Sequence, residues 1–114
     1  MLVHRLPHGS VSTLGFQFED FLYFTDFKYV PDEVMSSTKT PIHTVVLSAA
    51  RKIEHHSHSS MSESMELCHR FQSTRGVLTH LSHDYDHETD SKALPPKINL
   101  AYDGLRLDFS EGSR

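Results

Sequence analysis

The sequence predicts an α/β domain in which a mixed sheet packs against one main helix. Residues 14–18 alternate between apolar and polar side chains, as expected for a half-buried strand. Thr44–Leu47 is a continuous, largely β-branched apolar run, which is typical of a central strand covered on both faces. A third observation is an apolar stripe at helical spacing, formed by Met61, Met65, Cys68 and Phe71.

The first half of the chain favours a hairpin followed by a short helix. Val11–Asp26 is expected to form the β-hairpin, because a second apolar run, Phe21–Thr25, follows a polar break at Glu19 and Asp20. Pro31 and the two acidic residues after it favour a helix start, since proline fits the first turn and acids face the positive end of the helix dipole.

The main helix has a recognisable beginning. Ser60 and Glu63 fit a capping box, in which each side chain satisfies a free amide of the first turn. The helix is expected to end near Ser73–Gly76, with Gly76 suited to the left-handed turn that follows a helix. Gly76–His80 then forms a short strand that ends in a histidine.

The C-terminal part is expected to contain a loop and a second hairpin. Ser82–Lys92 is polar and is interpreted as a loop. Ile98–Tyr102 and Leu105–Phe109 flank Asp103-Gly104, a strong signal for a hairpin turn. The expected order is therefore two strands, a short helix, a strand, the main helix and three strands.

Length and composition exclude several classes of protein. A chain of 114 residues allows a single domain, here 1–114, and its net charge of −4 provides no basic face for nucleic acid. The longest uncharged apolar run, Thr44–Ala50, is too short to cross a membrane, and the N-terminus lacks the apolar core of a signal peptide. A single cysteine, Cys68, excludes an internal disulfide and fits the reducing cytoplasm.

Ten histidines are the unusual feature of the composition. His8 precedes the first hairpin, Asp26 ends its second strand, and His80 ends the strand after the main helix. A carboxylate and two imidazoles are a plausible half of a Zn²⁺ or Mn²⁺ site, and a pair of cations about 3.5–4 Å apart can hold a phosphate and a hydroxide together. His58, in the loop before the capping box, could protonate a leaving oxygen.

Each of these residues also has a simpler interpretation. A single loop histidine is more often solvated or hydrogen-bonded than bound to metal, and Asp26 alone could cap a turn. His87 is interpreted as a residue of a solvated loop. For His83 two interpretations are open: a loop residue, or a residue close to the metal. Cys68 lies within the apolar stripe and is interpreted as a buried thiol, not a nucleophile.

Several short motifs, taken in order, resemble the second half of the metallo-β-lactamase fold. They are His8-Gly9, Thr13–Phe16, Tyr23–Asp26 and Val46–Arg51. Further motifs are similar to the branch that contains the PhnP-type phosphoribosyl cyclic phosphate phosphodiesterases, and these are His58–Met61 with Glu63, Leu78–His83 and Ala101–Leu105. The resemblance covers the chain from about Val3 to Phe109.

The resemblance implies half of an αβ/βα sandwich that binds two divalent metals, Zn²⁺ or Mn²⁺, at one edge of its sheet. It implies His8, Asp26 and His80 as metal ligands, with Asp26 bridging the two cations. It also implies His58 as the general acid that acts on a small-molecule phosphodiester substrate.

The chain departs from the family in one important respect. The family motif His-x-His-x-Asp-His, which supplies most ligands of one metal, is absent, and His55-His56-Ser57-His58 does not replace it. We therefore expect the first half of the sandwich to be missing and the chain to be weak or inactive alone: a fragment, a truncated product, or one part of a split or dimeric protein. An apolar sheet face would then need a complementing chain or a second copy. The alternatives are a non-catalytic module for protein association and a simple metal binder.

Overall fold

The computed structural model of the protein describes residues 2–38, 42–49, 59–81, 85–102 and 104–107, with the backbone alone at residue 87. None of the helices in these ranges is long and apolar enough to cross a membrane. The elements, in chain order, are β1 (Leu2–His8), β2 (Val11–Phe18), β3 (Phe21–Phe24), α1 (Asp32–Ser37), β4 (Thr44–Ser48), α2 (Met61–Arg70), β5 (Arg75–Thr79), α3 (His87–Lys92) and β6 (Ile98–Leu100).

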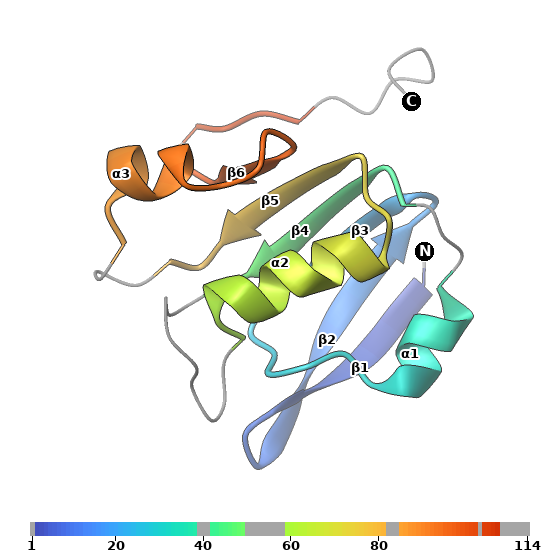
Figure 1. The fold of residues 1–114 in the computed structure, drawn as a ribbon. Helices are drawn as coiled ribbons and strands as arrows, with labels where there is room; N and C mark the ends of the chain where they lie inside the picture. Colours follow the sequence, from blue (N-terminus) through green and yellow to red (C-terminus); the bar gives the residue numbers. More distant parts are fainter. Residues whose placement is uncertain (1, 39–41, 50–58, 82–84, 103, 108–114) are drawn as a thin grey trace.

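The strands form one six-stranded mixed sheet in the order of the chain, from β1 to β6. β2 is antiparallel to β1 and to β3, whereas β3, β4, β5 and β6 pair in parallel. β1 therefore runs in the same direction as β3 to β6, and the carboxyl ends of these five strands lie at one edge of the sheet (Figure 1).

The central strand is β4, and the prediction of a buried strand at Thr44–Leu47 is confirmed. All five residues of β4 are buried, with Val45 and Leu47 in the main core cluster. α2 lies across the face of the sheet that carries Val45 and Leu47 (Figure 1), and it contributes Leu67 and Cys68 to the same cluster. Burial on both faces explains why β4 carries no alternation of polar side chains.

The main helix begins as the sequence predicts. The Ser60 side chain accepts a hydrogen bond from the Glu63 amide, and the Glu63 carboxylate accepts one from the Ser60 amide, which completes the capping box. The predicted stripe packs as core: Cys68 and Phe71 are fully buried, and Met61 and Met65 are partly buried against the cluster. The short helix after Pro31 is also present, with Pro31 at its N-cap position.

Three expectations for individual elements were wrong. Leu2–His8 forms strand β1, whose apolar pattern is interrupted by His4 and Arg5. The polar segment Ser82–Lys92 contains helix α3, which Asp86 caps by accepting hydrogen bonds from two amides of the first turn. Within the described residues the predicted C-terminal hairpin is not formed: residues 104–107 are not a strand, residues 103 and 108–109 lie outside the described residues, and β6 pairs in parallel with β5.

Gly76 has a different role from the one predicted. The left-handed residue after α2 is Gln72, with φ of 53°, whereas Gly76 lies within β5. A Cβ at Gly76 would lie 2.7 Å from the sulfur of Cys68, so the absence of a side chain lets α2 approach β5 closely. Glycine is needed here for packing, not for a turn.

Gly76→Ala is expected to lower the free energy of unfolding by about 1–3 kcal/mol, because the added methyl group overpacks this contact. Cys68→Ala removes the clashing sulfur, so the double variant is expected to lose less than the two single losses added together. Urea unfolding followed by circular dichroism measures all three variants. Strictly additive losses would contradict the assigned contact.

Candidate functional site

The candidate site lies at the edge where the parallel strands end. β1 ends at His8, β3 ends two residues before Asp26, and β5 ends one residue before His80. Because groups that follow parallel strands gather at one edge, residues far apart in the sequence lie on the same side of the sheet. This is the edge toward which the arrows of β4 and β5 point in Figure 1.

Two of the three predicted metal ligands lie in contact. The Nε2 atom of His80 is 3.0 Å from a carboxylate oxygen of Asp26. Both side chains are about half exposed, at 51% for His80 and 45% for Asp26, so a solute can reach the pair. The strand between β3 and β5 is β4, which ends at Ser48.

Both residues adopt a left-handed backbone, with φ of 55° at Asp26 and 58° at His80. This conformation is uncommon for residues other than glycine, although aspartate and histidine adopt it more often than most. It turns the chain sharply just after each strand. The same unusual geometry at both members of the pair indicates that the fold orients them.

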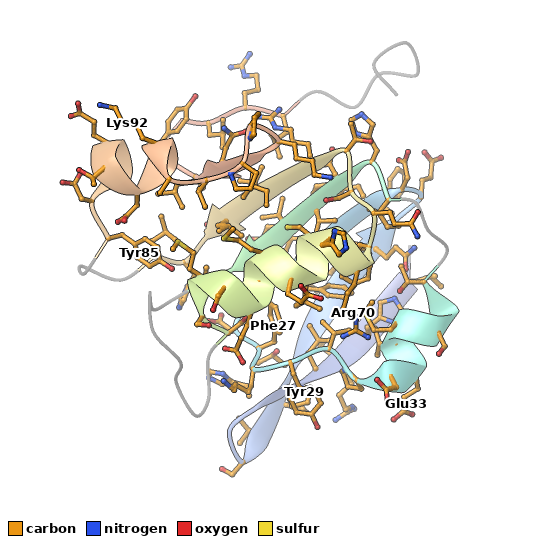
Figure 2. The ribbon with its side chains drawn as sticks, in the orientation of Figure 1. Phe27, Tyr29, Glu33, Arg70, Tyr85 and Lys92 are labelled. Carbon is orange, nitrogen blue, oxygen red and sulfur yellow. The ribbon has the colours of Figure 1, made fainter. Side chains whose placement is uncertain are left out.

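The segment that carries Asp26 is held by hydrogen bonds from three parts of the chain. The Thr13 hydroxyl on β2 donates to the Asp26 carbonyl at 2.9 Å. The Lys28 amide donates to the Pro7 carbonyl at 2.7 Å, and the Ser59 amide donates to the Phe27 carbonyl at 2.7 Å. Phe27, labelled in Figure 2, is fully buried in the core cluster that also contains Leu67 and Cys68 of α2, so the backbone next to Asp26 is anchored in the core.

A salt bridge joins this segment to the start of α2. The Lys28 ammonium donates hydrogen bonds to both Glu63 carboxylate oxygens, at 3.1 and 3.0 Å. Partial burial favours the neutral acid, but the Ser60 amide and the Lys28 ammonium stabilise the carboxylate, and the net effect lowers the pKa of Glu63. The Glu63 side chain therefore takes part both in the capping box and in the salt bridge to the segment after β3.

The segment that carries His80 is held by backbone contacts with two neighbours. The Ala49 amide donates to the Thr79 carbonyl at 2.9 Å, and the Ala101 amide donates to the Leu78 carbonyl at 2.7 Å. Beside His80 lies a depression of about 230 Å³, which is also lined by Ala101 and Tyr102. Pockets that enclose a small molecule usually measure about 300–1,000 Å³, so this depression is too small to enclose one, and Asp26 does not line it.

The other two predicted site residues are placed differently. His8 lies at the same edge on β1, separated from β3 by β2, and among the described residues no group of three His, Cys, Asp or Glu side chains is arranged to hold a metal. The contact that the structure shows at this edge joins Asp26 and His80, and His8 lies at the same edge. His58, the predicted general acid, and His83 lie outside the described residues.

The pair has the chemistry of a metal site. Carboxylate oxygen and imidazole nitrogen are both ligands for Zn²⁺ and Mn²⁺. Two such donors around a tetrahedral zinc lie roughly 3.4 Å apart, given bond lengths of about 2.1 Å, and the observed separation is 3.0 Å. Asp26 and His80 therefore fit two ligands of a divalent cation that needs further ligands from elsewhere.

Cys68 does not belong to this site. Its thiol is buried between α2 and β5, and burial raises its pKa to about 11. A thiol that stays protonated near neutral pH is not a nucleophile, which agrees with the sequence interpretation.

Comparison with known proteins places the chain in a family. Residues 3–81 match the family described as the beta-lactamase superfamily domain. The chain belongs to the beta-lactamase superfamily. The fold predicted from the sequence motifs is confirmed, and members of this superfamily are usually dependent on divalent metals.

Two longer proteins are similar to this superfamily chain over part of their length. A solved structure described as a new diphosphatase from the PhnP family is 32% identical and has a TM-score of 0.89, and the match covers 96% of this chain but 43% of that one. A protein of Porphyromonas gingivalis named octanoyltransferase is 28% identical over 94% of this chain and 22% of its own length. The chain therefore spans less than half of the solved relative and about a fifth of the curated one.

One face of the sheet lies opposite the helices and is largely apolar. The strand register places Val3, Phe16, Tyr23, Val46 and Val77 in a single row across five strands. Val3, Phe16 and Tyr23 are 55%, 38% and 43% exposed. On β2, Leu14 and Phe18 flank this row and are exposed as well. Val46 and Val77 are buried. We refer to the five exposed residues of this face as the open face: Val3, Leu14, Phe16, Phe18 and Tyr23.

Sequence reasoning did not single out Thr13 or Lys28 as part of the site. Their roles depend on contacts with residues 13 and 35 positions away, and a threonine in a strand or a lysine in a loop carries no local signal of such a contact. Thr13 did appear in a family-like motif, which was the one available indication.

Glu63→Gln is expected to lower the free energy of unfolding at pH 7 by about 1 kcal/mol or less, because it removes a partly exposed ion pair with Lys28. Since the pKa of Glu63 is lowered by folding, its stabilisation is present above its ordinary value of 4.5 and is lost as pH falls through the lowered value. The variant should therefore lose less stability on acidification than the parent.

Urea unfolding at pH 7 and at pH 3 measures this difference. Glu88→Gln is the matched control, because Glu88 pairs with Lys92 at 3.6 Å on an exposed helix face and should have little effect. Equal pH dependence in the parent and in Glu63→Gln would contradict the role given to Glu63.

Proposed function

We propose that this chain is the substrate-facing half of a metal-dependent phosphodiester hydrolase. The observation that carries the proposal is the contact between Asp26 and His80, 3.0 Å apart at the ends of parallel strands. The similarity to a solved structure described as a diphosphatase from the PhnP family supports it.

In this proposal Asp26 and His80 hold a divalent cation, Zn²⁺ or Mn²⁺, with His8 as a further ligand. The bound cation would supply Lewis acidity toward the phosphate and lower the pKa of a bound water. The side chains of Asp26 and His80 are half exposed, which leaves one side of the pair open to a small-molecule phosphodiester. His58 would donate a proton to the departing alkoxide oxygen. We also propose a cytoplasmic location, because the single cysteine needs no oxidising compartment.

We further propose that the open face is covered by the other half of the same fold. More than half of the solved relative lies outside the match, and an exposed apolar face of this kind marks an interaction surface. The other half would supply the missing ligands, so the chain alone is expected to be weak or inactive. If no activity appears with the other half present, the open face favours the second candidate function, a non-catalytic association module.

The metal proposal predicts that the chain binds Zn²⁺ or Mn²⁺ and that Asp26→Ala, His80→Ala and His8→Ala each weaken binding at least about tenfold. Each change removes one donor from the proposed site, and isothermal titration calorimetry measures the affinity. His69→Ala is the control, since His69 lies exposed near the end of α2, away from the pair. Retention of full affinity by all three variants, or loss only in the control, would contradict the assignment.

The coverage proposal predicts a one-to-one complex between this chain and the unmatched part of the PhnP-family diphosphatase, expressed as a separate polypeptide. Phe16→Lys with Tyr23→Lys should weaken the complex by about tenfold or more, because both side chains lie in the centre of the row. Tyr29→Lys is the control, an exposed aromatic residue between β3 and α1.

Size-exclusion chromatography with light scattering measures both stoichiometry and loss of binding. A homodimer of this chain that excludes the added half would overturn the proposed occupant. Hydrolysis of bis(p-nitrophenyl) phosphate by the complex, with Mn²⁺ present, separates the hydrolase from the association module.

A further inference from the structure

The orientation of Asp26 requires an explanation within the fold. Its backbone is left-handed, with φ of 55°, a conformation that few residues other than glycine, asparagine and aspartate adopt. The two residues that follow Asp26 are held by main-chain hydrogen bonds. The Ser59 amide donates to the Phe27 carbonyl, and the Lys28 amide donates to the Pro7 carbonyl. The hydrogen bond at 2.9 Å from the Thr13 hydroxyl acts on the carbonyl of Asp26 itself.

Thr13 is well suited to hold this carbonyl. It lies within β2, opposite Leu6 of β1, so its backbone is fixed by the antiparallel ladder. Its β-branched side chain has restricted rotation about χ1, which limits the directions of the hydroxyl. Leu6 is fully buried in the core, so the donor lies opposite a residue that is anchored there.

We infer that Thr13 is a positioning residue, whose hydroxyl fixes the Asp26 peptide and so directs the Asp26 carboxylate toward His80. The expected effect of Thr13 on metal affinity rests on the proposed function, because the Asp26 carboxylate is one of the proposed ligands. The carboxylate reaches His80 at 3.0 Å across the end of β4. A small rotation of the Asp26 peptide would turn the carboxylate away from the ring.

Thr13→Val removes the hydroxyl and keeps the shape, whereas Thr13→Ser keeps the hydroxyl. We expect Thr13→Val to lower Zn²⁺ affinity at least about tenfold, as is usual for residues that orient metal ligands, and Thr13→Ser to stay close to the parent. Thr38→Val is the matched control, because the Thr38 hydroxyl also donates to a main-chain carbonyl, that of Val34 at 2.8 Å, on another element.

A merely structural role for Thr13 makes a different prediction. Thr13→Val and Thr38→Val would then lose similar unfolding stability in urea, and neither would change Zn²⁺ affinity. That result would overturn the inference, as would equal loss of affinity in Thr13→Val and Thr13→Ser.

A second measurement does not depend on metal. Ring ¹⁵N chemical shifts of His80 in the metal-free chain report the contact between Nε2 and the Asp26 carboxylate. Thr13→Val should shift these resonances and Thr13→Ser should leave them in place; unchanged resonances in Thr13→Val would overturn the inference. Failure of the parent chain to bind Zn²⁺, with the ring shifts behaving as expected, would instead count against the proposed metal site alone.

Discussion

The handedness of the crossover connections is the constraint on which the rest of the structure depends. β3, β4, β5 and β6 are parallel neighbours in chain order, and each connection between them contains a helix. Such connections are almost always right-handed. Because the strand order advances in one direction, all three helices fall on the same face of the sheet (Figure 1). The opposite face is then left without any helix of the described chain, and the strand ends gather at a single edge.

That edge combines rigidity with access. The hydrogen bonds at Thr79, Pro7 and Phe27 fix the backbone close to Asp26 and His80, while the two side chains remain half exposed. Lys28 and Glu63 extend this support to the first turn of α2. Rigid backbone beneath reachable polar groups is the arrangement expected of a binding site on a sheet protein.

The sequence was most informative where the signals were local. Burial of β4, the capping box of α2 and the packing of Cys68 and Phe71 all follow from patterns within about ten residues. β1 was missed because His4 and Arg5 interrupt its apolar pattern. His4 is accommodated by a hydrogen bond to Gln17 at 3.0 Å and by edge contact with the Phe24 ring, which become visible only once the strands are paired.

The candidate site shows the same division between local and distant information. Asp26 and His80 were selected because each follows an apolar run that ends in a turn, and the structure places them in contact. The position of His8 relative to them depends on the number of strands in between, which no local pattern encodes. Gly76 shows how far local information reaches. Its position soon after a helix predicts a cap, whereas its role in packing depends on the Cys68 sulfur of α2, the element packed against it.

The buried thiol has a practical consequence of its own. With a pKa near 11, Cys68 exposes almost no thiolate at neutral pH, and it lies where α2 meets β5. An alkylating reagent can reach it only when helix and strand separate. The rate of alkylation therefore reports how often this interface opens. Cys68 is thus a single-site probe of local opening between α2 and β5.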